Sequence, residues 1–126
     1  MESQTTRTIE DKLYEIKIEN NNPGYIYVDQ APSMKNVFDF AVVFSDDLEI
    51  LNSKVLIYRE QHERQIGSKR WLKQFFGMTP SSRPELGKDI DGISGATISV
   101  SSMTNAINEL LVDVEYLSSK GIFSND

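Results

Sequence analysis

The segment from Met103 to Leu117 constrains the fold most strongly. Its apolar residues recur every three or four positions, at 103, 106, 107, 110, 111, 114 and 117. This spacing places them along one side of an α-helix and predicts an amphipathic helix of about four or five turns. Lys120 and Gly121 follow. A basic residue in the last turn with a glycine just beyond it is the expected end of such a helix.

The first half of the chain has a pattern that is typical of β-strands. Apolar and polar residues alternate over residues 14–18, and aromatic and β-branched residues are concentrated in 25–28, 37–44 and 48–58. Residues 20–24, with the sequence Asn-Asn-Asn-Pro-Gly, predict a turn, and Asp46-Asp47 predicts a hairpin turn between two long strands. Strands joined by short turns form an antiparallel meander.

A short helix is predicted between the strands and the long helix. It covers residues 68–76 and is closed by Gly77, after which an irregular loop with two prolines runs to Asp91. No linker or repeat divides the chain. We therefore expect one α+β domain over residues 13–126, built from an antiparallel β-sheet, a short middle helix and a long C-terminal helix. Residues 1–12 are expected to form a flexible N-terminal arm.

Composition excludes several kinds of site. The chain has no cysteine and a single histidine, His62, which excludes disulfides, thiolate metal sites, cysteine nucleophiles and histidine-rich metal sites. Asp89 and Asp91 lack the further clustered ligands that a metal site needs. The net charge of −6 argues against binding to nucleic acid or to anionic lipid.

Nothing in the sequence predicts a membrane span or an export signal. The longest apolar run, residues 40–44, is far shorter than the roughly 20 residues that cross a bilayer. The first twelve residues lack the basic region and the apolar stretch of a secretory signal. We therefore expect a soluble chain.

Chemistry is concentrated in the seven residues before the long helix, Asp91-Gly92-Ile93-Ser94-Gly95-Ala96-Thr97. The two glycines permit tight turning and close approach of the backbone, and the serine and threonine offer hydroxyl groups. Backbone N–H groups and the positive end of the helix dipole attract anions, so this segment predicts a phosphate site. The alternative is that Ser94, Thr97 or Ser99 only caps the helix.

Residues 92–96 also approach the Gly-x-Ser-x-Gly nucleophile elbow of hydrolases. The final position is Ala96 rather than glycine, His62 precedes the serine instead of following it, and 126 residues are too few for that fold. A hydrolase is therefore rejected.

The string Asp91-x-x-Ser94-Gly95-Ala96-Thr97 resembles the flavinylation motif of the FMN-binding domain family, whose members include flavoprotein subunits of Rnf-type and sodium-pumping NADH:quinone reductase complexes. The resemblance implies that Thr97 carries FMN through a phosphodiester bond. It implies that Ser94, Gly95 and Ala96 form the loop on the phosphate side. It also implies that Asp91 serves recognition by, or reaction with, a flavin transferase.

A second stretch, residues 57–77, extends the likeness to about residues 14–118. It contains Glu60 in a turn, followed by Trp71, Gln74, Phe75 and Gly77 in the family's aromatic-Gln-Phe-x-Gly pattern. The family often has Thr-Pro-Gly after the glutamate, where this chain has Gln61-His62-Glu63. This departure leaves the role of Glu60 open.

Aromatic residues near the motif are candidates for a wall against the flavin ring, because they offer flat apolar surfaces. These candidates are Tyr58, Trp71, Phe75 and Phe76. Together with the motif residues, Glu60 and Trp71 are the expected cofactor-binding residues. Ordinary core packing is the alternative for each aromatic side chain.

The resemblance implies an electron carrier rather than an enzyme with its own substrate, since the flavin supplies the redox chemistry. A hydroxyl nucleophile needs activation, and no histidine or cysteine lies near Thr97 in the sequence. The resemblance implies that a separate, Mg²⁺-dependent transferase uses FAD as its substrate, attaches FMN to the threonine and releases AMP. Expected partners are this transferase and redox proteins, including those of a membrane electron-transport complex. The expected location is extracytoplasmic, periplasmic or membrane-associated.

Two other functions stay open. The same fold could hold FMN without a covalent bond, as a sensory or regulatory module. It could also be an interaction domain that has lost its flavin.

Overall fold

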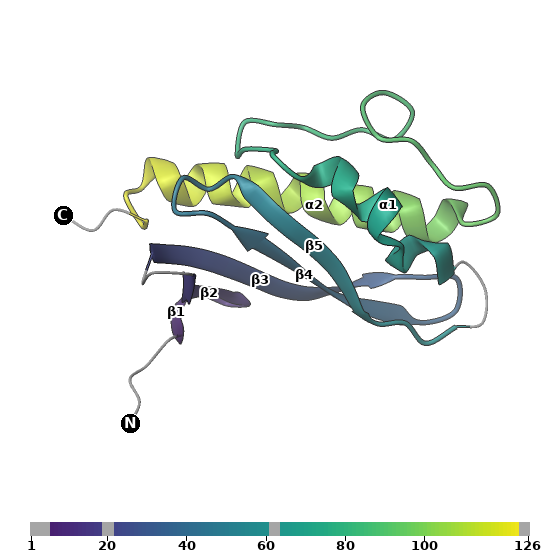
Figure 1. Ribbon diagram of the computed structural model, residues 1–126, viewed down its shortest axis with the longest axis horizontal. Coiled ribbons are helices and arrows are strands. Elements are labelled where there is room, and N and C mark those ends of the chain that lie inside the picture. The colour runs from purple at the N-terminus through teal and green to yellow at the C-terminus, as the bar shows by residue number, and fades with distance from the viewer. Residues whose placement is uncertain (1–5, 19–21, 61–63, 124–126) are drawn as a thin grey trace.

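The computed structural model describes residues 6–18, 22–60 and 64–123 (Figure 1). The strands in these ranges are β1 (Thr6–Glu10), β2 (Leu13–Ile18), β3 (Asn22–Pro32), β4 (Val37–Phe44) and β5 (Ile50–Ile57). The helical elements are η2 (Arg64–Gly67), α1 (Lys69–Leu72), η3 (Lys73–Phe75) and α2 (Thr97–Ser119). An antiparallel sheet with a short and a long helix is the α+β fold that the sequence predicts.

The described strands form one sheet in the order β1-β2-β3-β4-β5, and each pair is antiparallel, which confirms the meander. Residues 6–10, which were expected to belong to a flexible arm, form strand β1 and pair with β2. This segment contains the β-branched residues Thr6, Thr8 and Ile9, which suit a strand. The Asp11-Lys12 turn, in which Lys12 has a φ of 69°, returns the chain into β2.

The predicted turn at Asp46-Asp47 joins β4 to β5. The Ser45 N–H donates to the Glu49 carbonyl, and the Leu48 N–H donates to the Ser45 carbonyl, both at 2.9 Å. Leu48 has a φ of 66°, outside the range of a strand, and its side chain is buried. Strand β5 therefore begins at Ile50, two residues later than predicted.

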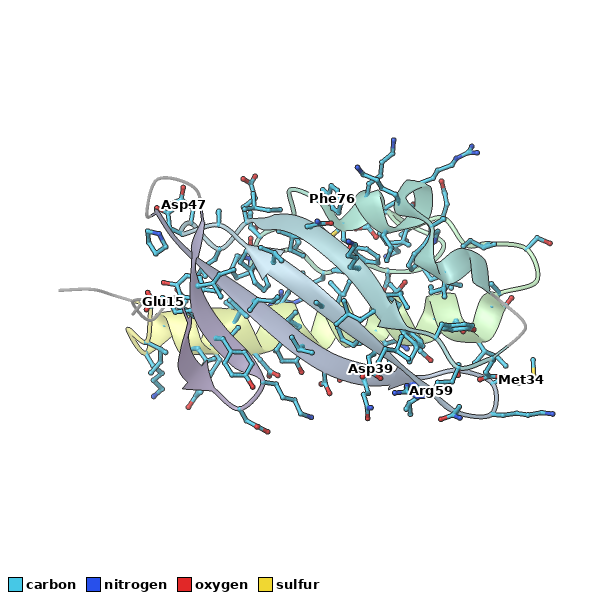
Figure 2. The ribbon with its side chains drawn as sticks, turned by 60° about the horizontal axis from the view of Figure 1, so that its bottom comes forward. Glu15, Met34, Asp39, Asp47, Arg59 and Phe76 are labelled. Carbon is cyan, nitrogen blue, oxygen red and sulfur yellow. The ribbon has the colours of Figure 1, made fainter. Side chains whose placement is uncertain are left out.

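Helix α2 lies along one face of the sheet, and the other face of the sheet is turned toward the viewer in Figure 2. The side chains of β4 that are fully buried are Phe38, Phe40, Val42 and Phe44. The buried residues of α2 are Ser99, Val100, Met103, Thr104, Ile107, Leu110, Leu111 and Val114. The helix has 23 residues, about six turns. It exceeds the predicted length because its buried side continues back past Met103 to Ser99.

The predicted middle helix is present, but it is divided into α1 and the 3₁₀ turn η3. Ser68 caps α1, and its Oγ accepts a hydrogen bond from the Trp71 N–H at 3.2 Å. Gly77 follows with a φ of 89°. Ser53 of β5 donates its hydroxyl to the Leu72 carbonyl at 3.0 Å and so fixes α1 to the sheet. Within the described ranges, none of the helices combines the length and the apolar character of a membrane span.

Candidate cofactor-binding site

The predicted phosphate segment forms a loop that ends at the first residue of α2. That residue is Thr97, and its side chain is exposed, as are Ser94 and Gly95. Ala96, directly before the helix, is buried, and the helix has no hydrogen bond from its N–H groups to a capping side chain. The alternative that Ser94, Thr97 or Ser99 serves as the helix cap is therefore wrong.

The uncapped helix start offers backbone donors. The first hydrogen bond of the helix runs from the Val100 N–H to the Ala96 carbonyl at 3.0 Å. The N–H groups of Thr97 and Ile98 precede it and have no acceptor inside the helix. Both residues are exposed, and the helix dipole adds partial positive charge at this end. This arrangement suits a phosphate group.

A buried contact fixes this helix start to the sheet. Ser99 is fully buried, and its Oγ lies 2.9 Å from the hydroxyl of Tyr58, which directly follows β5. The Tyr58 ring also contacts the ring of Phe38, with 5.8 Å between the centroids. Tyr58 therefore serves the packing of the domain, in keeping with the core-packing interpretation.

Two side chains from the α1 region hold the other end of the loop. Trp71 Nε1 donates to the Asp91 carbonyl at 2.6 Å. Gln74 Oε1 accepts from the Asp91 N–H at 2.8 Å, and Gln74 Nε2 lies 3.4 Å from the Asp91 carbonyl oxygen and 3.1 Å from that of Trp71. The Asp91 carboxylate is exposed, and it has no hydrogen bond or ion pair with any other residue that the structure describes. The backbone of Asp91 is thus fixed while its charge stays accessible.

A pocket of about 600 Å³ lies between α1 and this loop. Its lining consists of Ser68, Arg70, Trp71, Lys73, Gln74, Asp91, Gly92 and Ile93. The volume is in the range of small-molecule sites. Arg70 and Lys73 are exposed and form no ion pair with the other described residues, so they bring two positive charges to the pocket rim against the one negative charge of Asp91. The pocket and the open helix start share one loop, since residues 91–93 line the pocket and the loop ends at Thr97, and this combination fits a ring system that carries a phosphate group, as FMN does.

The aromatic candidates near α1 differ in their position. Trp71 lines the pocket, although only 4% of its surface is exposed. Phe75 is fully buried and packs edge-on against Trp71, with 5.3 Å between the ring centroids. Phe76 is half-buried and packs against the core. Of these three side chains, Trp71 is the one that borders the pocket.

Two further hollows lie between β3 and α2, with volumes of about 410 and 310 Å³, and Tyr27 and Asp113 line both. The remaining lining includes the carboxylates of Asp11, Asp29 and Glu109. Burial, followed by the hydrogen bond to Asp29, raises the pKa of Tyr27. Because negative charges repel a phosphate, these hollows suit FMN less well than the pocket beside α1.

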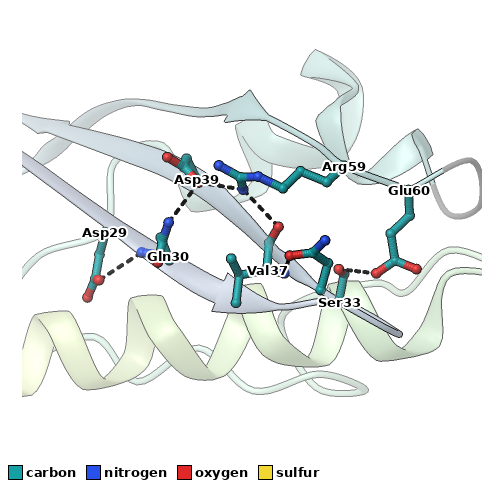
Figure 3. A network of polar contacts seen from close by, with 8 residues as sticks. Asp29, Gln30, Ser33, Val37, Asp39, Arg59 and Glu60 are labelled. Carbon is teal, nitrogen blue, oxygen red and sulfur yellow. Dashed lines mark hydrogen bonds and ion pairs between the residues drawn. The ribbon is translucent and has the colours of Figure 1, made fainter.

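Glu60 contacts a different part of the molecule. Its Oε2 accepts a hydrogen bond from the Ser33 hydroxyl (Figure 3). It also accepts one from the Lys35 N–H at 2.8 Å, and so holds the β3–β4 turn. A role for Glu60 in cofactor binding stays a prediction. His62 lies outside the described residues.

The site residues that sequence reasoning did not single out are Arg70 and Lys73. Gln74 was quoted only as part of the aromatic-Gln-Phe-x-Gly pattern, without a role at the motif loop. Gln74 follows Trp71 by three positions, which places both side chains on one side of a helical turn, and this spacing is the signal that links them. The two cations lie in a charged stretch whose proximity to Asp91 depends on the tertiary fold. Among the residues that the structure describes, no three histidine, aspartate or glutamate side chains gather to hold a metal ion.

The family model of the FMN-binding domain matches residues 34–112, more than half of the chain. The match extends over β4, β5, α1, the motif loop and most of α2. It is shorter than the span of about 14–118 that the sequence patterns suggested. No curated protein matches the chain. The family match agrees with the uncapped helix start and the pocket beside it, and the chain belongs to the FMN-binding domain family.

Proposed function

We propose that this domain is an electron carrier in which FMN is joined to Thr97 by a phosphodiester bond. The observation that carries this proposal is the position of Thr97. Its exposed side chain stands at the first residue of an uncapped helix, at the end of a loop of small residues whose first three residues line a pocket that also has Arg70 and Lys73 at its rim. A hydroxyl in this position is open to reaction, and the phosphate that it receives meets unused N–H donors.

The chain's own groups would hold the cofactor. The N–H groups of Thr97 and Ile98 would donate to the phosphate oxygens, and the helix dipole contributes about 0.3–1 kcal/mol. Arg70 and Lys73 add positive charge at the rim, and the edge of Trp71 supplies apolar surface. FMN, when bound, supplies one- or two-electron redox chemistry, while the protein sets its orientation and surroundings.

Attachment requires a second protein, because a threonine hydroxyl is a weak nucleophile and needs a base. We infer a separate, Mg²⁺-dependent transferase with FAD as the donor. Thr97 Oγ1 forms a bond to the phosphorus on the FMN side, the phosphoanhydride bond breaks and AMP leaves. The hydroxyl proton passes to a base of the transferase, and nothing is oxidised or reduced. The exposed Asp91 carboxylate is available for recognition by that protein.

The intact mass of the protein tests this proposal. The chain is co-expressed with a flavin transferase, denatured and weighed, together with Thr97→Ala and with Ser118→Ala, which removes an exposed hydroxyl of the same helix outside the motif. We expect an increase equal to one FMN minus water in the wild type and in Ser118→Ala, and its complete loss in Thr97→Ala. An unchanged increase in Thr97→Ala would refute attachment at this residue.

The same experiment separates the other functions. Flavin that copurifies with the folded protein and is released on denaturation, without a mass increase, indicates a non-covalent FMN module. A colourless protein that also fails to bind added FMN indicates an interaction domain. We further propose redox proteins, such as those of a membrane electron-transport complex, as electron donor and acceptor, and an extracytoplasmic location. The resemblance of residues 91–97 to the flavinylation motif of the FMN-binding domain family supports the redox partners and the extracytoplasmic location.

A further inference from the structure

We propose that Gln74 is a positioning residue that holds the loop of residues 91–96, and with it the Thr97 hydroxyl, in the conformation that receives FMN. This inference rests on the proposed attachment at Thr97. Gln74 acts through the backbone of Asp91, six residues before Thr97, so its contribution is to geometry.

The chemistry of the contact is specific to an amide side chain. Gln74 accepts from the Asp91 N–H at 2.8 Å with Oε1 and turns Nε2 toward the Asp91 carbonyl at 3.4 Å. The same Nε2 donates to the Trp71 carbonyl at 3.1 Å, which orients the amide from inside the helical turn. A glutamate can accept but cannot donate, and a leucine does neither. Gln74 therefore pairs both backbone groups of one loop residue.

The loop between its two fixed ends has little else to hold it. At the far end, Ala96 is buried and its N–H donates to the Ile93 carbonyl at 3.0 Å. Between the ends, Gly92, Ser94 and Gly95 are exposed. Without Gln74 the Asp91 N–H loses its acceptor, and only the hydrogen bond from Trp71 to the Asp91 carbonyl still holds that end of the loop. Glycine is free to adopt many backbone conformations, so a loop that is held less firmly at Asp91 can populate arrangements that move Thr97.

Gln74 is also a better site for a test than Trp71, which binds the same carbonyl. Trp71 is buried in the core, so its replacement leaves a cavity as well as a lost hydrogen bond. Gln74 is half-buried, and Gln74→Leu removes the polar contacts while keeping a side chain of similar size. Gln74→Glu keeps one acceptor and loses the donor.

The control is Gln30→Leu. Gln30 is an exposed glutamine of β3 whose Nε2 donates to Asp39 Oδ1 at 3.2 Å (Figure 3). The variant Gln30→Leu also loses an amide contact to a neighbouring group, but in strand β3 and not at the loop of residues 91–96. Thermal unfolding of each variant shows whether the domain is folded at the assay temperature.

The experiment measures the initial rate of FMN attachment by a purified flavin transferase with FAD and Mg²⁺, and hydrogen exchange of the amides in residues 91–96. We expect Gln74→Leu to lower the maximal rate by about tenfold to a hundredfold, with the KM for FAD unchanged and exchange in the loop accelerated. Gln74→Glu should lie between Gln74→Leu and the wild type. Gln30→Leu should match the wild type.

A wild-type attachment rate in Gln74→Leu overturns the inference, whatever the exchange shows. If Gln74→Leu does not fold, a wild-type rate in Gln74→Glu overturns it equally. If the wild-type chain itself takes up no FMN, the proposed function fails first. If the wild type is loaded through Thr97 and the Gln74 variants are loaded as fast, only this inference fails.

Discussion

Substitution by alanine is predicted to change the stability of the protein in opposite directions at Gly92 and at Gly95. Gly95 has a φ of +83°, and a Cβ added there meets nothing within 4 Å, so the cost of Gly95→Ala is conformational and not steric. Alanine in the left-handed region costs about 1–2 kcal/mol. Gly92 lies outside that region, and its added Cβ would sit 3.7 Å from Leu86 Cδ1, an ordinary contact. Gly92→Ala should therefore stabilise the protein by about 0.4–1 kcal/mol, because alanine restricts the unfolded chain.

Urea unfolding followed by the fluorescence of Trp71, the single tryptophan, measures both changes. The free energies of unfolding of the two alanine variants should differ by about 1.4–3 kcal/mol, with Gly95→Ala the less stable. Gly95→Asn should lie between Gly95→Ala and the wild type, since asparagine tolerates the left-handed region better than alanine. FMN attachment to the folded proteins should fall in Gly95→Ala and stay at the wild-type level in Gly92→Ala.

The argument about Gly95 would be refuted if Gly95→Ala were as stable and as fully loaded with FMN as the wild type. Equal damage by the two alanine substitutions would refute it as well. That result would mean that the loop tolerates no added methyl group at all, and that the conformation of Gly95 is not the cause.

Two further predictions concern the scaffold. Ser53→Ala removes the hydroxyl that donates to the carbonyl of the buried Leu72. The substitution should lower the free energy of unfolding by about 1–3 kcal/mol. A loss below about 0.5 kcal/mol would show that α1 is not held by this hydrogen bond. The hydrogen bond from Arg59 holds the pKa of Asp39 below its usual value of 3.8 (Figure 3). The carboxylate therefore stabilises the fold above that value, and this stabilisation is lost as the pH falls through the lower pKa of the folded state. Asp39→Asn should reduce the loss of stability below about pH 4, and identical pH profiles for the two proteins would contradict the assignment.

The spacing of apolar residues predicted most of the fold, because a helix or strand that buries one side repeats its apolar residues with its own structural period. Most of the apolar stripe predicted for the long helix is buried in α2, with Ala106 and Leu117 partly buried, and the aromatic-rich residues 37–44 form strand β4 as predicted. Strand β1 escaped prediction because its residues are mostly polar, and its pairing with β2 depends on the hairpin at Asp11-Lys12. The apolar spacing of α2 begins only at Met103, because the first six residues of the helix are rich in serine and β-branched residues, which are modest helix formers. Burial of Ser99 and Val100 helps to hold these first turns in the helix.

The candidate site divides in the same way. The string around Thr97 is local, so the sequence alone nominates the residue and its loop. The partners of Asp91 were not predictable, because the contact with Gln74 forms only when α1 packs beside the loop. The position of Glu60 at the β3–β4 turn was equally hidden, since it depends on how the chain continues after β5.

The loop that precedes Thr97 is shaped by residues far from it in the chain. Its partners lie 17 positions upstream at Gln74 and 20 at Trp71, while the first turn of α2 is tied to Tyr58, 41 positions before Ser99. A free heptapeptide with the sequence of residues 91–97 would have the residues of the motif but would not be held in its conformation. If FMN is attached to Thr97 as proposed, attachment depends on the folded state: only chains whose sheet and helices have packed together present the threonine correctly, and misfolded chains stay without flavin.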